Sequence, residues 1–132
     1  MASSSRTAVF IVDDLAAMRE RLRELICDVE GMYVVGEAGS PKEAIDGIRR
    51  NRPDCVLLDY QLVDGTGIDV IRAIHPQWPQ IVFIVLTNHA TPQHRRACVD
   101  AGARFFFDKS TEFSEIRTTL ARIDAMAHPF AR

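Results

Sequence analysis

Five short apolar runs recur along the chain, with longer amphipathic segments between them. The runs are rich in β-branched or aromatic residues and mostly lack polar alternation, and they span residues 8–12, 33–35, 55–58, 81–86 and 105–107. An unbroken apolar run is typical of a parallel strand that is covered on both faces. The pattern therefore predicts five buried, parallel strands.

The segments between the runs carry apolar residues at intervals of three and four, as amphipathic helices do. The apolar face of the first predicted helix is formed by Leu15, Met18, Leu22, Leu25, Ile26 and Val29. The second helix begins at Ser40-Pro41-Lys42-Glu43, a capping box with proline at the first helical position. The third follows Gly65-Thr66-Gly67, and the last repeats Phe113, Ile116, Leu120 and Ile123.

The fourth predicted helix has the weakest apolar face. It begins at Thr91-Pro92 and ends at Gly102, and its apolar side is formed only by Ala97, Cys98 and Ala101. A small apolar area gives little stabilisation on packing. We therefore expect this helix to be the least firmly docked of the five.

The regular alternation of strands and helices predicts an α/β fold. Strand–helix–strand units with parallel strands have right-handed crossovers, and they place helices on both faces of the sheet. We expect one domain over residues 7–127, with flexible ends at 1–6 and 128–132.

The composition limits the classes of function. With 132 residues, 47% of them hydrophobic, the chain can form one domain with a core. Sixteen basic residues against eighteen acidic ones give a net charge of -2, which argues against direct DNA binding. We expect no membrane insertion, because no apolar run is long enough and the N-terminus lacks a signal-peptide core. Cys27, Cys55 and Cys98 are predicted to be packed, reduced thiols of a cytoplasmic protein.

The residues that end the predicted strands carry the candidate chemistry. Asp13 and Asp14 follow the first strand, and Asp59, Thr87 and Lys109 end the third, fourth and fifth. Ligands of an open parallel sheet bind at the carboxyl ends of the strands, so we expect these side chains to converge. Three converging carboxylates would repel one another unless a hard cation such as Mg2+ bound between them. With a hydroxyl and a lysine, they form the set of groups that phosphoryl transfer to an aspartate requires.

Each of these residues also has an ordinary explanation. The pair Asp13-Asp14 could cap the following helix, and Asp59 could cap a loop. Thr87 and Lys109 could be an ordinary strand-end threonine and a surface lysine. Their occurrence in order, at successive strand ends, favours the functional interpretation.

Two other sets of polar residues are interpreted as solvent-exposed. His89 and His94 lack a cysteine or a third histidine nearby, so a metal site formed by them is not predicted. The charges of the first helix are interpreted as a solvated face, formed by Arg19, Glu20, Arg21, Arg23 and Glu24.

The chain resembles the receiver domain of bacterial two-component response regulators, of the chemotaxis-regulator-like type. The resemblance covers nearly the whole sequence and rests on Asp13-Asp14, on Asp59 with Gly67 eight residues later, on Thr87, and on Ala101-Gly102-Ala103 before Phe106 and Lys109. It implies a flavodoxin-like, doubly wound (βα)5 three-layer sandwich, with a five-stranded parallel sheet of order 2-1-3-4-5.

The resemblance implies a role for each acidic residue. Asp59 would be the phosphoacceptor. Asp14 would bind Mg2+ directly and Asp13 would help through water, while Asp59 and the backbone carbonyl of Gln61 would complete the protein ligands of the metal.

The resemblance also implies a switch. Thr87 would move its hydroxyl to the phosphoryl group, and Lys109 would form an ion pair with that group. Phe106 would be the aromatic residue that changes rotamer with Thr87. Because side chains alternate along a strand, Phe105 and Phe107 are expected to point to the opposite face.

Two departures from the family's pattern concern the backbone. Val63 stands where proline is common, four residues after the phosphoacceptor, so Asp64-Gly65 is expected to make the turn. Ser110 stands where proline usually follows the lysine, so a trans peptide is expected there.

A third departure concerns access to the phosphoryl group. Asn88 stands where a small residue usually follows the switch hydroxyl, and we expect it to narrow the approach. Gln61 and His89 flank the route by which water would reach the acyl phosphate. We therefore expect Gln61, Asn88 and His89 to modulate the rates of phosphorylation and dephosphorylation.

These features predict a stand-alone receiver domain that is not an enzyme beyond self-phosphotransfer and autodephosphorylation. The expected partners are a sensor histidine kinase or a histidine phosphotransfer protein, and a downstream protein target. The signal would leave through the face formed by the fourth helix, the fifth strand and the fifth helix, which is also the candidate surface for a homodimer.

Two alternatives remain open at this point: the domain could be a phosphate sink or an unphosphorylated docking module. The sequence argues against two other classes of function. An aspartyl-nucleophile phosphatase would need a second aspartate as its proton donor, but the triplet here is Asp59-Tyr60-Gln61. A flavodoxin-like cofactor binder would need a loop rich in Gly, Ser or Thr after the first strand, where Asp13-Asp14 stands instead.

Overall fold

A computed structural model describes residues 6–127 of the chain. Its elements follow one another in the order β1 (Thr7–Val12), α1 (Ala16–Cys27), β2 (Met32–Ala38), α2 (Pro41–Asn51), β3 (Cys55–Asp59), β4 (Gln61–Leu62), β5 (Gly65–Thr66), α3 (Gly67–Ile74), β6 (Val82–Thr87), α4 (Pro92–Ala101), β7 (Phe105–Asp108) and α5 (Phe113–Ala127). None of the helices within this part of the chain is long and apolar enough to cross a membrane. The predicted flexible ends, 1–6 and 128–132, lie outside the described residues apart from Arg6, so the domain bounds stay a prediction.

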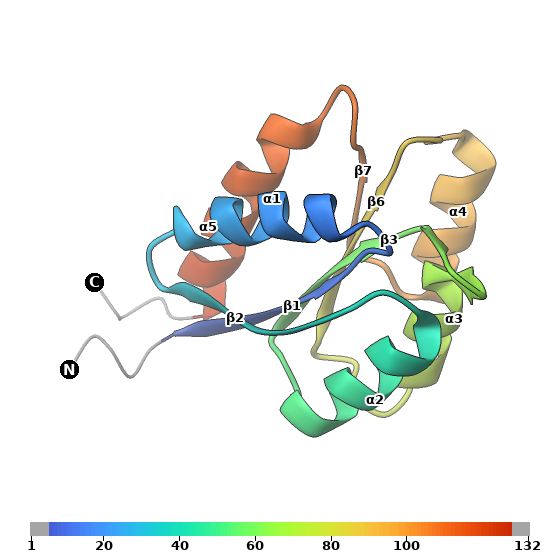
Figure 1. The fold of residues 1–132 in the computed structure, drawn as a ribbon, viewed down its shortest axis with the longest axis horizontal. Coiled ribbons are helices and arrows are strands. Elements are labelled where there is room, and N and C mark those ends of the chain that lie inside the picture. The colour runs from blue at the N-terminus through green and yellow to red at the C-terminus, as the bar shows by residue number, and fades with distance from the viewer. Residues whose placement is uncertain (1–5, 128–132) are drawn as a thin grey trace.

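The five long strands form one parallel sheet. Its order is β2-β1-β3-β6-β7, which is the predicted order 2-1-3-4-5 once the short strands β4 and β5 are left out. Figure 1 shows α1 and α5 together on one side of the sheet, and α2 and α3 on the other. The predicted doubly wound α/β sandwich is therefore confirmed.

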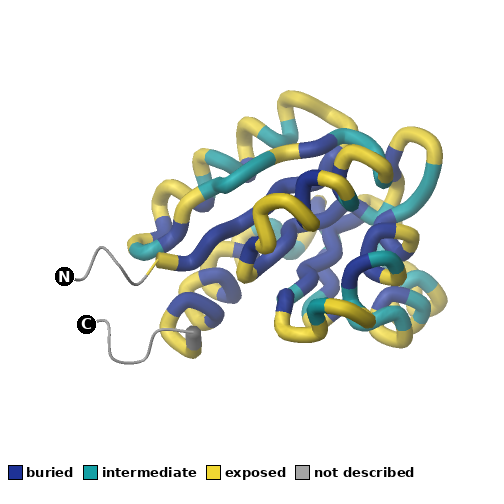
Figure 2. The backbone as a smooth tube through the Cα atoms, turned by 90° about the horizontal axis from the view of Figure 1, so that it is seen from below, coloured by how far each residue is buried: buried dark blue, intermediate teal, exposed yellow. Residues whose placement is uncertain are grey.

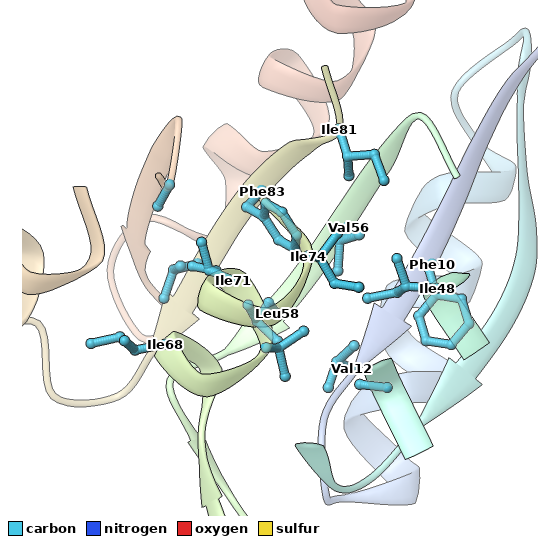
Figure 3. Packing of buried hydrophobic residues seen from close by; sticks show 14 of the residues in the cluster. Phe10, Val12, Ile48, Val56, Leu58, Ile68, Ile71, Ile74, Ile81 and Phe83 are labelled. Atoms are coloured by element: carbon cyan, nitrogen blue, oxygen red, sulfur yellow. The ribbon is translucent and has the colours of Figure 1, made fainter. Parts of the chain in front are cut away.

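The two faces of the sheet bury separate clusters of apolar side chains. Successive strand residues point to opposite faces, so Phe10 and Val12 of β1 pack toward α2 and α3, whereas Val9 and Ile11 pack toward α1 and α5. Figure 3 shows the first cluster, and Figure 2 shows buried strands between helices that are buried on one side only. Because helices cover both faces of the sheet, the side chains on both sides of each central strand are buried, and this explains the unbroken apolar runs.

β2 is longer than the apolar run at 33–35 predicts. It continues through Gly36 and Glu37 to the end of the element, with a register shift relative to β1. A Cβ at Gly36 would lie 2.6 Å from the ring of Phe10, so only glycine fits there without movement. Glu37 forms ion pairs with Arg19 and Arg23 of α1. These tertiary contacts, rather than hydrophobicity, explain the extra length.

The loop after β3 contains a short antiparallel pair, β4 and β5, which the apolar pattern does not predict. Asp64 lies between them with a φ of 67°, in agreement with the turn expected at Asp64-Gly65. The carboxylate of Asp69 accepts a hydrogen bond from the N–H of Thr66 at 3.0 Å. This contact fixes the start of α3.

Two residues near the ends of α1 are more exposed than predicted. Leu15, expected on the apolar face, immediately precedes the helix and is 59% exposed. Cys27, expected to be packed, is exposed at the last helical position. The helical period does not extend to Leu15, which precedes the helix, and Cys27 lies about one turn after the exposed Glu24, on the solvent side of α1. Cys55 and Cys98 are buried, as predicted.

α4 has the thin apolar face that its sequence predicts. Cys98 is its only buried residue. The hydroxyl of Thr91 accepts a hydrogen bond from the N–H of His94 at 3.1 Å, and Gly102 ends the helix with a φ of 124°. Both predicted ends of this helix are therefore correct.

Candidate metal centre at the carboxyl edge of the sheet

The polar residues at the strand ends meet at one edge of the sheet. Asp13 and Asp14 follow β1, Asp59 ends β3, Thr87 ends β6 and Lys109 follows β7. These four strands are neighbours and parallel, so their carboxyl ends lie side by side. Asp14 is exposed, and the other four residues are buried. The fold thus brings together all five residues that the sequence suggests for the chemistry.

Lys109 joins two of the acidic residues. Its Nζ lies 2.7 Å from Oδ2 of Asp13 and 3.1 Å from Oδ2 of Asp59, and its side chain is 3% exposed. Burial lowers the pKa of Lys109, but the hydrogen bonds and negative charges of the two carboxylates outweigh it, and the net shift is upward. The ammonium group therefore stays charged beside them.

The carboxyl group of Asp59 is in a less favourable environment. Burial raises its pKa, the ammonium of Lys109 lowers it and the charge of Asp13 raises it again, so that the net shift is upward. The N–H of Gln61 donates a hydrogen bond to Oδ1 of Asp59 at 3.3 Å. Holding Asp59 ionised thus costs free energy, which a bound cation would reduce.

The three carboxylates are close enough to share a metal ion. One oxygen each from Asp13, Asp14 and Asp59 lies within 4.8 Å of the others. Carboxylate oxygens are the ligands that Mg2+ prefers, and Mg2+ usually keeps several waters, for which the exposed side of Asp14 leaves room. The set of residues fits Mg2+. Gln61, the predicted source of a carbonyl ligand, is exposed in the loop after Asp59.

Gly67 allows α3 to begin against the strand that carries Asp59. A Cβ at Gly67 would lie 2.6 Å from the carbonyl oxygen of Asp59, closer than side chains approach backbone. The N–H of Gly67 donates to the carbonyl of Tyr60 at 2.7 Å. The spacing of eight residues between Asp59 and Gly67 therefore has a steric cause.

Comparison with known proteins identifies the family. The family model that describes the response regulator receiver domain matches residues 9–121 of this chain. The chain belongs to the receiver domain family. The predicted family is thereby confirmed, and the acidic edge of this receiver domain lies at the carboxyl ends of its parallel strands.

Two curated relatives of this receiver domain are transcriptional regulators. It is 33% identical over 111 residues to the transcriptional regulatory protein YhcZ of Bacillus subtilis, covering 84% of this chain and 52% of YhcZ. It is 32% identical over 117 residues to the DNA-binding transcriptional activator DevR/DosR of Mycobacterium tuberculosis. That match covers 89% of this chain and 54% of DevR/DosR. The chain spans about half the length of the curated relatives it matches, and its predicted stand-alone organisation stays a prediction.

Solved structures share the fold. A two-component response regulator of the LuxR family from an Aurantimonas species has a TM-score of 0.85 and 30% identity, with 92% of this chain and 87% of that chain covered. A CheY-like receiver domain protein from Methanospirillum hungatei has a TM-score of 0.83 and 21% identity, with 95% and 98% covered. The flavodoxin-like arrangement of this receiver domain is therefore shared with both.

Among the predicted switch residues of the receiver domain, Thr87 and Lys109 lie at the acidic edge and Phe106 lies in the interior. The hydroxyl of Thr87 accepts a hydrogen bond from the N–H of His89 at 3.1 Å, and both His89 and Asn88 are exposed. Phe106 is buried in the cluster on the α3 and α4 side, and the guanidinium of Arg95 lies 5.0 Å from its ring centre. Among residues 6–127 no peptide bond is cis, so the bond before Ser110 is trans, as expected.

Two contacts of the receiver domain are not predicted from its sequence. Arg19 was expected on a solvated face, but it is half-buried and donates a hydrogen bond to the carbonyl of Asp13. His94 was expected to be solvated, but its ring stacks on Tyr60 with centres 4.4 Å apart, and it is half-buried. The stack of His94 on Tyr60 joins separate elements and leaves no local signal, and the side chain of Arg19 is held by an ion pair with Glu37 of β2, which is also distant in sequence.

Proposed function

We propose that this receiver domain accepts a phosphoryl group on Asp59 from the phosphohistidine of a sensor histidine kinase or of a histidine phosphotransfer protein. The observation that carries the proposal is the buried contact of Lys109 with Asp13 and Asp59, at 2.7 and 3.1 Å. It places a fixed positive charge beside a carboxylate at the end of a central strand. An oxygen of Asp59 attacks the phosphorus while the bond to the histidine nitrogen breaks, and an acyl phosphate results.

The other residues at this edge stabilise the charge of the transferring group. Asp13, Asp14 and Asp59, with the backbone carbonyl of Gln61, are the proposed Mg2+ ligands. When bound, Mg2+ neutralises charge on the phosphoryl oxygens. Lys109 remains to pair with the phosphoryl group, and the hydroxyl of Thr87 donates a hydrogen bond to it. Self-phosphotransfer and autodephosphorylation are the only reactions proposed, so no separate substrate is turned over.

Three exposed residues are proposed to set the lifetime of the acyl phosphate. Gln61 lies in the loop after Asp59, and Asn88 and His89 follow the switch threonine. All three are exposed beside a buried nucleophile, so each can obstruct or orient an attacking water.

The proposed output is a change in the face formed by α4, β7 and α5. Phe106 of β7 is buried beneath this face, and its contact with Arg95 connects the interior to the surface of α4. A downstream protein, or a second copy of the domain, would bind there. We propose that the domain acts in the cytoplasm without direct contact to DNA, in keeping with its net charge of -2.

The decisive experiment identifies the phosphorylated residue. The protein is incubated with Mg2+ and acetyl phosphate, and intact-mass and peptide mass spectrometry are recorded. We expect one base-labile phosphoryl group on Asp59, none in Asp59→Asn, and normal labelling of Asp64→Asn, a control in the neighbouring turn. Phosphate on a serine or histidine, or full labelling in excess chelator, would show that the proposed function is wrong.

A further inference from the structure

Arg19 lies in the first turn of α1, and its side chain reaches back to the loop that carries two of the carboxylates. Its Nη1 donates a hydrogen bond to the backbone carbonyl of Asp13 at 2.5 Å. Side chains of a helix lean toward its N-terminus, so this position is suited to such a contact. The side chain is 24% exposed, which leaves it mostly screened from solvent.

The carbonyl of Asp13 belongs to the peptide group that joins Asp13 to Asp14. On one side of it, the N–H of Asp13 donates to the carbonyl of Ala38 at 3.0 Å. On the other, the N–H of Leu15 donates to Oδ1 of Asp13 at 2.9 Å. Arg19 thus supplies the contact that holds the peptide between the two acids. Fixing this peptide fixes the directions in which both carboxylates leave the backbone.

Glu37 fixes the guanidinium of Arg19 in turn. Its Oε1 lies 3.3 Å from Nε of Arg19, and its Oε2 accepts a hydrogen bond from Nη1 of Arg23. Glu37 stands near the end of β2, opposite Ile11 of β1. Arg19 therefore connects the sheet to the acidic loop. A planar guanidinium can make both contacts at once, whereas a lysine ammonium has no such fork.

We infer that Arg19 is a positioning residue for the Mg2+ site: it holds the peptide between Asp13 and Asp14 so that both carboxylates face Asp59. This inference rests on the proposed function and deepens it. In this role, Arg19 strengthens Mg2+ binding, although its positive charge alone would weaken it. A cation near a metal site repels the metal, but a group that orients the ligands strengthens binding.

Because the loss of charge and the loss of ligand orientation change Mg2+ affinity in opposite directions, Arg19→Met tests the inference. Mg2+ is titrated into the metal-free full chain by calorimetry. We expect roughly tenfold weaker binding in the variant, the usual size for loss of a group that orients metal ligands. Arg23→Met is the matched control, because it removes the same charge and a Glu37 contact but leaves the Asp13 carbonyl untouched. It should bind Mg2+ as tightly as the wild type or slightly more tightly.

A second measurement needs no metal and no activity. In the metal-free protein, amide hydrogen exchange at Leu15 should be faster in Arg19→Met than in Arg23→Met, because the loop loses its anchor. If Arg19→Met does not fold, Arg19→Lys is used, which keeps the charge but can make only one of the two contacts, and an intermediate Mg2+ affinity is expected.

The outcomes separate this inference from the proposed function. A wild type that binds no Mg2+ would overturn both. A wild type that binds Mg2+, with Arg19→Met or Arg19→Lys binding as tightly or more tightly, would overturn the role of Arg19 alone. Equal amide exchange at Leu15 in Arg19→Met and Arg23→Met would also overturn the role of Arg19 alone.

Discussion

Lys109 holds together carboxylates that would otherwise repel one another. Three acidic side chains share one edge, and one buried ammonium contacts two of them. Breaking a buried ion pair is costly, since the partner is left charged and unpaired. Asp13 is the closer partner of Lys109, so Lys109 keeps a carboxylate even if the charge of Asp59 is removed. Asp59 is thus the member of this group whose charge can be removed without leaving Lys109 unpaired.

The first prediction is that Asp59→Asn stabilises the metal-free protein, by about 1 kcal/mol at pH 7. The asparagine has nearly the same shape and removes a buried charge. Because folding raises the pKa of Asp59, the cost of its charge applies above that raised pKa and disappears below the ordinary value of 3.8. The gain should therefore shrink as the pH falls. Urea unfolding in chelator at pH 7 and pH 4.5 measures it.

The control for this prediction is Asp64→Asn, which removes an exposed carboxylate from the same loop. It should leave the free energy of unfolding nearly unchanged at both pH values. A loss of stability in Asp59→Asn, or a gain that grows toward low pH, would contradict the cost assigned to this buried charge.

Asn88 leads to a second prediction at the residue scale. Asn88→Ala should accelerate phosphorylation by acetyl phosphate severalfold, since a smaller side chain widens the approach beside Thr87. The residue is exposed, so the folded state should be retained. Initial rates of labelling by mass spectrometry, with circular dichroism as the check on folding, test this. Rates equal to those of the wild type would show that Asn88 does not shape the approach.

At the scale of elements, the strands were predictable where burial alone determines them. β1, β3, β6 and β7 are apolar because both sheet faces are covered, so their runs are visible in the sequence. β2 is visible only in part, because its second half depends on Glu37 and on the fit of Gly36 against Phe10. Contacts between distant residues leave no periodic signal.

The candidate site likewise has residues that the sequence predicts and residues that only tertiary contacts reveal. Its five principal residues end strands, so fold class and strand order together place them at one edge. The contacts of Arg19 and His94 depend on tertiary packing, because Arg19 pairs with Glu37 of β2 and His94 stacks on Tyr60, which follows β3. Charge and residue type do not distinguish such residues from solvated ones, so only the structure reveals them.

The third prediction concerns α4, which buries only Cys98, whereas the shorter α3 buries five residues. Native-state hydrogen exchange should therefore show the amides of α4 opening at lower free energy than those of α3. The stack of His94 on Tyr60 is a contact that restrains its first turn. His94→Ala should speed exchange there further, and Gln93→Ala, at an exposed neighbouring position, should not. Equal protection of α3 and α4 would contradict the prediction.

At the scale of the whole molecule, the acidic edge lies where β6 leads into α4 and where β7 ends, so it adjoins the proposed output face. Thr87 stands directly before the loop that leads into α4, and the N–H of Lys109 donates a hydrogen bond to the carbonyl of Thr87 at 2.8 Å. A phosphoryl group bound by both would pull on the weakly docked helix. The exposed side of that helix carries Val99, which is 52% exposed, about one turn after Arg95 and Arg96, and Arg96 pairs with Asp100. An exposed apolar residue bordered by charges of both signs is suited to a protein partner.

The final prediction is that phosphorylation changes this face and leaves the opposite one unchanged. With Mg2+ and beryllofluoride, which mimics the phosphoryl group, amide shifts or hydrogen exchange should change along 95–102 and at Phe106, whose ring contacts Arg95. Residues on the outer side of α2, such as Arg49, should not respond, because α2 packs mainly against α3 and β2. Arg117 and Arg122, exposed on α5, should become protected when a partner or second copy binds. Changes confined to the loops of Asp13, Asp14 and Asp59 would exclude an output switch and favour a phosphate sink.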